Sequence, residues 1–290
     1  MTQFFTFPHL CCPLDGEPLT GNETSLVCIK GHSFDIARKG YVNLLNVQYK
    51  RSKDPGDSKE MVLARRAFLE AGHFAPVSNH MNEIIKRLAH PNSEYSILDA
   101  GCGEGYYLDR LYRALGEDET SLKVSLSGVD ISKQAIQAAA GRNKEIQWLV
   151  ASNRQLPIQG ETIDTIVCGF GFPVYESFAH VLKSQGRVLL IEAGENHLIE
   201  LRELLYPELK ERSERMWPAS FTVVEQSQLR YSFELDTNKE IENLLFMTPH
   251  FFRASYEGKQ RAKALNSLKL TADVRYTLLT KTNSAKHIAL

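Results

Sequence analysis

A glycine-rich segment that follows a short apolar run constrains this chain more than any other feature. The run Ile97–Ala100 contains Asp99, and Gly101, Gly103 and Gly105 then alternate ahead of a helix-like stretch. Glycine tolerates positive φ and lets a ligand approach the backbone closely. At the carboxyl edge of a parallel sheet, such a loop is a ligand position. The G-x-G-x-G spacing differs from the dinucleotide fingerprint G-x-G-x-x-G, so a nicotinamide cofactor fits poorly.

Apolar runs alternate with helix-like stretches from about residue 95 onward. This alternation predicts an α/β fold with a mostly parallel sheet and helices on both faces. We expect strands at 96–100, 124–130, 146–151, 162–170, 186–194, 221–236 and 274–281. We expect helices at 60–72, 77–89, 108–115, 132–141, 175–183 and 197–206, with one more between the last two strands. Ser132 is placed to cap the helix that follows it.

Three features of this region point to the same cofactor. The segment Asp99–Gly105, D-A-G-C-G-E-G, resembles the first motif of class I methyltransferases, which holds the amino-acid end of S-adenosylmethionine. The next strand ends at Asp130, whose carboxylate can bind both ribose hydroxyls. Ser152 ends the third strand, near the adenine position of such folds. We therefore expect S-adenosylmethionine and a class I methyltransferase fold, Rossmann-like with a mostly parallel seven-stranded sheet.

Two short turns near the N-terminus look like the halves of a zinc ribbon. Tetrahedral zinc needs Cys or His pairs on two tight turns, and the candidates are Cys12, Cys28 and His32. Asp15 stands where another Cys is expected. A carboxylate suits a structural zinc less well, so a bound zinc and a metal-free ribbon both stay open. The five cysteines are odd in number and unevenly spaced, which suits a reduced cytoplasm.

Charge is distributed unevenly along a chain whose net charge is only −1. Between Lys30 and His73 there are nine basic and five acidic residues, and such a local surplus is one footprint of nucleic-acid binding. The basic residues nearest to the Asp54–Asp57 turn are Lys50, Arg51, Lys53, Arg65 and Arg66. We find no apolar run of about 18 residues and no signal-peptide pattern at the N-terminus. We therefore expect a cytoplasmic protein without a membrane span.

Taken together, these segments resemble the bacterial 23S rRNA (guanine-N1)-methyltransferase family of the RlmA type. The resemblance runs from about Cys12 to the end and is carried by HSFDIARKGYVNLL, KRSKDPGDSKEM, ARRAFLEAGHF, LDAGCGEGYY, ASNRQLP and MTPHFFRA. It implies a cytoplasmic enzyme that methylates N1 of a guanine in a hairpin loop of large-subunit rRNA. It also implies a zinc-ribbon-like RNA-recognition module, which we expect at 1–45. A basic linker with helices at 46–92 and a methyltransferase domain at 93–290 should follow. A homodimer is one assembly that the sequence leaves open.

The resemblance also assigns individual residues. The family's cofactor contacts match Gly103, Glu104 and His197. A family tyrosine corresponds to Phe74, which keeps the ring and loses the hydroxyl. The metal ligands match Cys12, Cys28 and His32, and the remaining family cysteine falls on Asp15.

No residue is assigned as a catalytic base. Candidates for stacking on the target guanine are Tyr175, Phe170, Phe172, Phe251 and Phe252. Two alternative functions stay open: a small-molecule methyltransferase that uses the ribbon only as scaffold, and a non-catalytic RNA-binding protein that has kept the fold.

Overall fold

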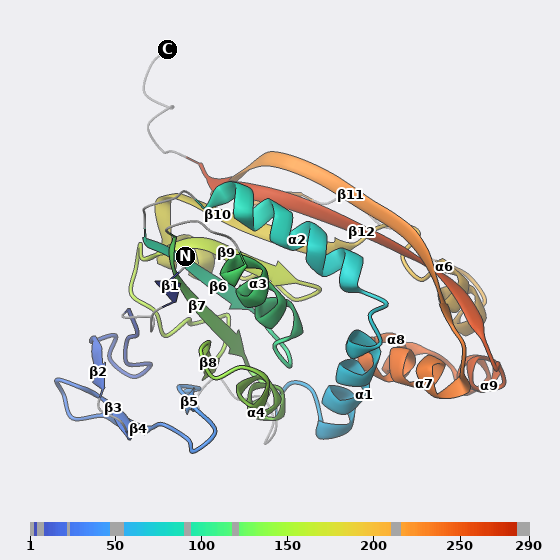
Figure 1. Ribbon diagram of the computed structural model, residues 1–290, viewed down its shortest axis with the longest axis horizontal. Helices are drawn as coiled ribbons and strands as arrows, with labels where there is room; N and C mark the ends of the chain where they lie inside the picture. Colours follow the sequence, from blue (N-terminus) through green and yellow to red (C-terminus); the bar gives the residue numbers. More distant parts are fainter. Residues whose placement is uncertain are drawn as a thin grey trace, which may run out of the picture.

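A nine-stranded sheet forms the centre of the computed structural model, which describes residues 3–4, 9–21, 24–46, 55–89, 94–117, 122–209 and 216–282. Seven of its strands are β6 (Glu94–Ala100), β7 (Lys123–Asp130), β8 (Gln147–Val150), β9 (Ile163–Gly169), β10 (Leu182–Ala193), β11 (Phe221–Leu235) and β12 (Leu268–Lys281). Their order is β11-β12-β10-β9-β6-β7-β8. Strand β12 runs antiparallel to both of its neighbours, β11 and β10, and the other pairs are parallel. The expected class I methyltransferase fold is confirmed (Figure 1).

Two strands from the N-terminal region extend this sheet beyond the seven that we expected. Strand β5 (Tyr41–Asn43) pairs in parallel with β8, and β1 (Gln3–Phe4) pairs in parallel with β7. The segment expected to belong to a separate ribbon module thus contributes strands to the main sheet.

The central strands are buried on both faces, and alternate residues point to opposite sides. Ile97 packs into a core with α2 and α3, whereas the next residue, Leu98, packs into a second core with α5. This period of two follows from strand geometry. The helices are α1 (Lys59–Glu70), α2 (Ala75–Leu88), α3 (Tyr106–Gly116), α4 (Lys133–Arg142), α5 (Tyr175–Val181) and α6 (Ile199–Leu205). Ser132 caps α4 as expected, since its Oγ accepts the N–H of Ala135 at 3.2 Å.

The region between β11 and β12 differs from the expectation of a single helix. It holds α7 (Asn238–Met247), α8 (His250–Arg253) and α9 (Tyr256–Lys263). Each helix has its own N-cap residue: the hydroxyls of Thr237 and Ser255 cap α7 and α9, and Pro249 precedes α8. The segment therefore forms three short helices instead of one. Strand β12 also begins at Leu268, six residues before the expected start at Val274. No described helix combines the length and apolar character needed to cross a bilayer.

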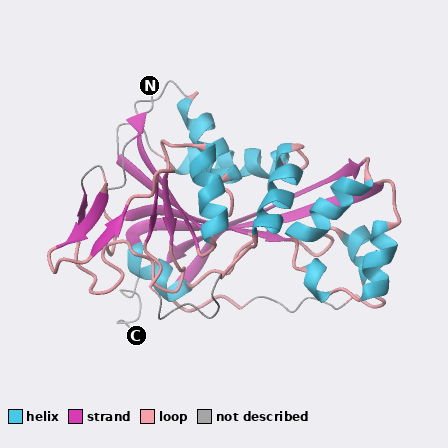
Figure 2. Ribbon diagram, turned by 90° about the horizontal axis from the view of Figure 1, so that it is seen from below, coloured by secondary structure: helices cyan, strands magenta, loops and turns pink. Residues whose placement is uncertain are grey.

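The ribbon is a three-stranded antiparallel sheet of β2 (Leu19–Gly21), β3 (Ser25–Cys28) and β4 (Ser33–Asp35). It lies at the opposite end of the molecule from the α7–α9 helices (Figures 1 and 2). Backbone hydrogen bonds join it to the loop after β8: Cys11 N–H donates to Pro157 O at 3.0 Å, and Gln159 N–H donates to His9 O at 2.8 Å. Leu10 and Ile158 share one apolar core. The ribbon is therefore fixed to the methyltransferase core.

Candidate cofactor and metal sites

The glycine loop connects β6 to α3, and its three glycines differ in the space around them. Gly101, Gly103 and Gly105 have φ of 96°, 56° and 84°, a left-handed region that favours glycine. A β-carbon on Gly105 would lie 2.7 Å from the Trp148 ring, so this position is closed by packing. A β-carbon on Gly101 would meet only the Asn153 amide, at 4.0 Å. The open side of the loop therefore lies at Gly101.

Two carboxylates adjoin this loop. Asp130 accepts hydrogen bonds from the backbone N–H of Gly103 at 3.0 Å and of Ser132 at 2.8 Å. Asp99 is buried at the end of β6, with 4% of its surface exposed. Burial, followed by the negative charge of Asp130, raises the pKa of Asp99 to about 7. Burial also raises the pKa of Asp130, against the two backbone N–H groups that lower it. Two carboxylates at neighbouring strand ends are suited to a ligand that carries hydroxyl or N–H groups.

Three aromatic rings meet at the carboxyl ends of β9 and β10. The centroids of Phe74 and Phe170 lie 6.0 Å apart with the rings nearly parallel, and each centroid lies 5.8 Å from that of His197. His197 Nδ1 accepts the backbone N–H of Asp273 at 3.2 Å, which leaves the ring proton on Nε2. Phe170 has a φ of 51°, a strained value for a residue with a side chain. The rings of the two predicted cofactor contacts, Phe74 and His197, are thus brought together.

Asp273 supports this group, and sequence reasoning did not identify it. Its Oδ2 accepts the N–H of Asn196 at 2.8 Å, and its Oδ1 accepts Gln228 Nε2 at 2.5 Å. A β-carbon on Gly194 would overlap the Asp273 carboxylate, at 2.4 Å. The available signal was an acidic residue between apolar neighbours, which predicts a buried carboxylate with specific partners.

Two further predicted cofactor contacts, Glu104 and Ser152, interact with other residues of the protein. Glu104 is 1% exposed and forms an ion pair with Arg142, which also pairs with Glu70 at 3.1 Å. Glu104 Oε1 is buried without a hydrogen-bond partner among the described residues. Ser152 Oγ accepts the N–H of Arg154 at 3.2 Å and so stabilises its own turn. The roles of both residues toward the cofactor stay predictions.

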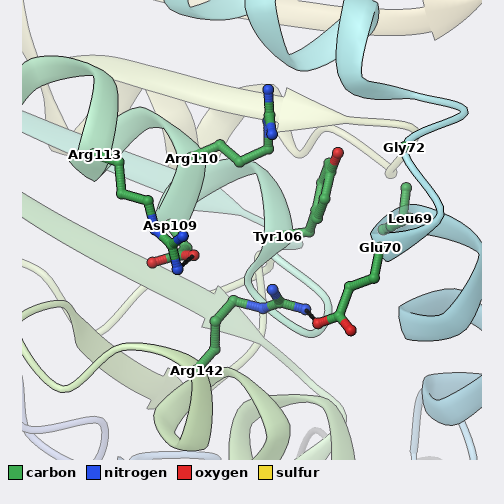
Figure 3. A pocket seen from close by; sticks show the side chains of 8 residues that line it. All are labelled: Leu69, Glu70, Gly72, Tyr106, Asp109, Arg110, Arg113 and Arg142. Carbon is green, nitrogen blue, oxygen red and sulfur yellow. Dashed lines mark hydrogen bonds and ion pairs between the residues drawn. The ribbon is translucent and has the colours of Figure 1, made fainter.

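A pocket of about 410 Å³ lies beside the cofactor loop rather than on it (Figure 3). It is formed by α1, α3 and the end of α4, and Arg142 reaches across it to Glu70. Its lining consists of Leu69, Glu70, Gly72, Tyr106, Asp109, Arg110, Arg113 and Arg142. None of the predicted cofactor residues lines it.

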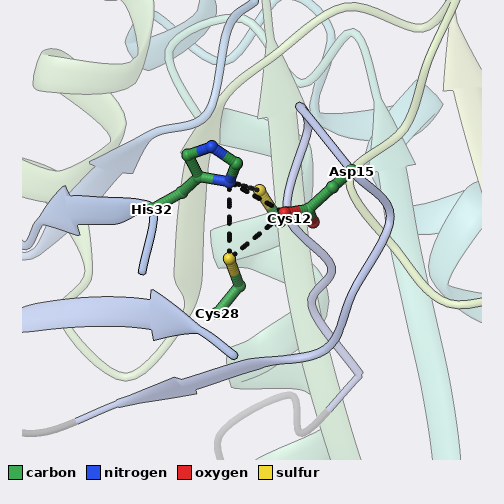
Figure 4. A group of neighbouring side chains, drawn as sticks. All are labelled: Cys12, Asp15, Cys28 and His32. Carbon is green, nitrogen blue, oxygen red and sulfur yellow. Dashed lines mark hydrogen bonds and ion pairs between the residues drawn. The ribbon is translucent and has the colours of Figure 1, made fainter. Parts of the chain in front are cut away.

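The four candidate metal ligands converge on one point (Figure 4). His32 Nδ1 lies 3.6 Å from Cys12 Sγ, 3.5 Å from Cys28 Sγ and 2.8 Å from Asp15 Oδ2. Usual zinc–ligand lengths at a tetrahedral angle place a nitrogen and a sulfur about 3.6 Å apart. All four donor atoms lie within 4.8 Å of one another, so Asp15 completes a four-donor set. The donor chemistry and the spacing fit Zn²⁺.

The structure describes only part of the basic segment around the Asp54–Asp57 sequence. Lys50, Arg51 and Lys53 lie outside the described residues. Arg66 is on the surface, where its Nε donates to Glu70 at 3.0 Å. Arg65 instead points inward to the glycine loop and pairs with Asp57, a position that the sequence did not predict.

The aromatic candidates for base stacking separate in the same way. Phe170 joins the ring group with Phe74 and His197, whereas Tyr175 packs on Phe221. Phe251 stacks on Phe246, and the neighbouring Phe252 is exposed, as is Phe172 near the end of β9.

Comparison with known proteins identifies two regions of the chain and relatives over most of its length. Residues 10–53 match the family described as RlmA, N-terminal, and residues 97–190 match the family described as methyltransferase domain. A Bacillus subtilis (strain 168) protein with the printed name "Putative 23S rRNA (guanine-N(1)-)-methyltransferase YxjB" is 31% identical over 94% of this chain and 98% of its own length. The 23S rRNA (guanine(748)-N(1))-methyltransferase of Streptomyces fradiae is 30% identical over 79% of this chain and 80% of its own. The chain therefore belongs to the RlmA-type family of 23S rRNA (guanine-N1)-methyltransferases.

Proposed function

We propose that this protein transfers the methyl group of S-adenosylmethionine to N1 of a guanine in a hairpin loop of large-subunit rRNA. One observation carries the proposal: the similarity to a relative named as a 23S rRNA (guanine-N(1)-)-methyltransferase extends over 94% of the chain, and the matching families cover the metal cluster, in residues 10–53, and the glycine loop, in residues 97–190. The glycine loop alone is shared by methyltransferases of many substrates. The ribbon joined to it in one core favours an RNA substrate.

S-adenosylmethionine supplies a methyl group on a sulfonium, and the protein mainly has to position the two reactants. We assign the ribose to Asp130, the amino-acid end to the loop Asp99–Gly105, and the adenine to the turn at Ser152. The ring of Phe74 lies next to the rings of both Phe170 and His197. Because Nδ1 accepts the Asp273 N–H and the ring proton is on Nε2, His197 is not a base in this tautomer.

The target guanine must present its Watson–Crick edge, because N1 is on that edge and carries a proton at neutral pH. A paired guanine hides N1, so the base must be unpaired or extruded. Phe170, which is 40% exposed next to Phe74 and His197, is placed to stack on such a base.

The RNA contacts belong to the N-terminal part of this proposal. We assign recognition to the ribbon at 1–45, holding Zn²⁺ through Cys12, Asp15, Cys28 and His32, and phosphate binding to Lys50, Arg51 and Lys53 in the linker at 46–92. Each lost phosphate contact lowers the salt dependence of RNA affinity by about one unit. Lys50→Ala/Arg51→Ala/Lys53→Ala should flatten this slope and leave S-adenosylmethionine affinity unchanged. An unchanged slope removes the segment from the interface.

Labelled methyl transfer to 23S rRNA tests the activity itself. The protein is incubated with S-adenosyl[methyl-³H]methionine and rRNA that lacks the modification, and the digested nucleosides are separated. The proposal predicts label in 1-methylguanosine, and none with Gly103→Val. Label in another nucleoside, or transfer only to small molecules, contradicts it, and absence of cofactor binding supports a non-catalytic RNA-binding protein. The cytoplasmic location and the homodimer belong to the same proposal.

A further inference from the structure

Arg65 reaches from α1 to the cofactor loop at Gly103. Its Nη1 lies 3.5 Å from the position that a β-carbon on Gly103 would occupy, and its Cδ lies 3.9 Å from that position. The side chain is only 23% exposed, although Arg65 is on a surface helix. The positively charged guanidinium therefore lies over the loop, although Arg65 precedes Gly103 by 38 residues in the sequence.

Two contacts hold the guanidinium in this place. It forms an ion pair with Asp57, and Nη2 donates to the carbonyl of Met247 at the end of α7 at 3.3 Å. Asp57 is itself fastened to the sheet edge, because Ser132 Oγ donates to the Asp57 carbonyl at 2.7 Å. The neighbouring Gly56, with a φ of 83°, lies so close that a β-carbon would be 2.8 Å from that of Ser132. Gly56 and Asp57 thus join Arg65 to the strand end that bears Asp130.

The charges around the loop are suited to a zwitterion. Asp99 and Asp130 are acidic, and alone they would repel a carboxylate. Arg65 supplies the opposite charge beside Gly103. A guanidinium has five N–H donors in a planar fork, and among the described residues its acceptors are only Asp57 and Met247. The remaining donors can bind a carboxylate in the paired geometry typical of arginine.

We infer that Arg65 binds the α-carboxylate of S-adenosylmethionine and that Asp57 positions it for this contact. The inference rests on the proposed use of S-adenosylmethionine and assigns one group of that molecule to one side chain. It separates Arg65 from Arg66, its neighbour in the basic segment, which faces the surface and pairs with Glu70.

The test compares S-adenosylmethionine with its decarboxylated form, which lacks only this group, by isothermal titration. Arg65→Ala should weaken S-adenosylmethionine by about tenfold to a hundredfold, the usual effect of a lost charged hydrogen bond. It should change the affinity for the decarboxylated form by less than about twofold. Arg66→Ala is the matched control and should leave both affinities unchanged.

Arg65→Lys keeps the charge and loses the fork, so it should weaken S-adenosylmethionine selectively but less than Arg65→Ala. This variant decides the question if Arg65→Ala does not fold. Equal losses for the two ligands would overturn the inference and make Arg65 a structural residue, while the proposed function stands. Failure of the unmodified protein to bind S-adenosylmethionine would overturn both.

Discussion

The carboxylate of Asp130 accepts the backbone N–H of Gly103 at 3.0 Å, so the end of β7 directly shapes the loop after β6. Its second oxygen accepts the N–H of Ser132 at 2.8 Å. The acidic strand end therefore holds the loop, and this one side chain joins the end of β7 to the loop after β6. It is also the group to which we propose that the ribose binds.

Removal of this carboxylate should weaken the cofactor. Asp130→Ala should reduce S-adenosylmethionine affinity by roughly 1–3 kcal/mol, because ribose hydroxyls lose a charged acceptor and the Gly103 N–H loses its partner. Isothermal titration measures the effect, and the melting temperature without cofactor separates it from general unfolding. Affinity equal to that of the unmodified protein would place the ribose elsewhere.

The loop glycines should respond differently to a methyl group. Gly105→Ala places a β-carbon 2.7 Å from Trp148 at a φ of 84°, so thermal denaturation should show a loss of roughly 2–4 kcal/mol. Gly101→Ala meets open space in the free protein and should keep more stability, yet lose cofactor affinity because the methyl fills the ligand side. Gly103→Val should abolish binding for the same reason. If Gly101→Ala binds normally and Gly105→Ala is as stable as the unmodified protein, the ligand side has been misassigned.

Asp99 predicts a pH dependence of stability with a definite sign. Its pKa is raised to about 7 in the folded protein by burial and by Asp130, whereas an unfolded aspartate titrates near pH 3.9. The folded state binds the extra proton between these values, so this contribution is fully present below about pH 4 and is lost as pH rises through 7. Asp99→Asn cannot ionise. Its stability relative to the unmodified protein should therefore increase from pH 5 to pH 8, by at most about 4 kcal/mol. Urea denaturation without cofactor gives the difference, and a constant or decreasing difference would contradict the assignment.

The ribbon should carry one zinc per chain. Cys12, Asp15, Cys28 and His32 form a compatible donor set, and Asp15→Cys should bind the ion more tightly because thiolate is the better ligand for structural zinc. Elemental analysis after dialysis against increasing chelator measures retention. Asp15→Asn is the matched variant that weakens the fourth ligand and should lose zinc first. Protein purified without chelator that holds no zinc, in both the unmodified and the Asp15→Cys forms, would indicate a metal-free ribbon.

Local pattern was enough to predict the cofactor loop and the class of fold. The alternating glycines after Asp99 and the acidic end at Asp130 are adjacent in sequence to the strands that present them. The pairing of β5 with β8 was not predictable, because a strand of three residues has almost no periodicity and its partner lies about a hundred residues away.

The sequence did not predict the direction in which individual side chains point. Asp15 was left open as a ligand because a carboxylate suits a structural zinc less well than a thiolate. The structure brings its Oδ2 to 2.8 Å from His32 Nδ1, a contact that depends on how two turns fold against each other. Arg65 and Arg66 read as one basic surface, yet adjacent residues on a helix face different directions. The contact of Arg65 with the loop at Gly103 depends on how α1 packs, which no local pattern contains.

Primer extension on 23S rRNA from cells with and without this gene tests the central claim most directly. Methylation at N1 blocks the Watson–Crick edge, so reverse transcriptase stops beside the modified guanine. We predict one guanine stop, in a hairpin loop, that disappears when the gene is deleted. It should return with the unmodified gene and not with Gly103→Val. Identical stops in all strains, or a lost modification that leaves N1 free, would contradict the account.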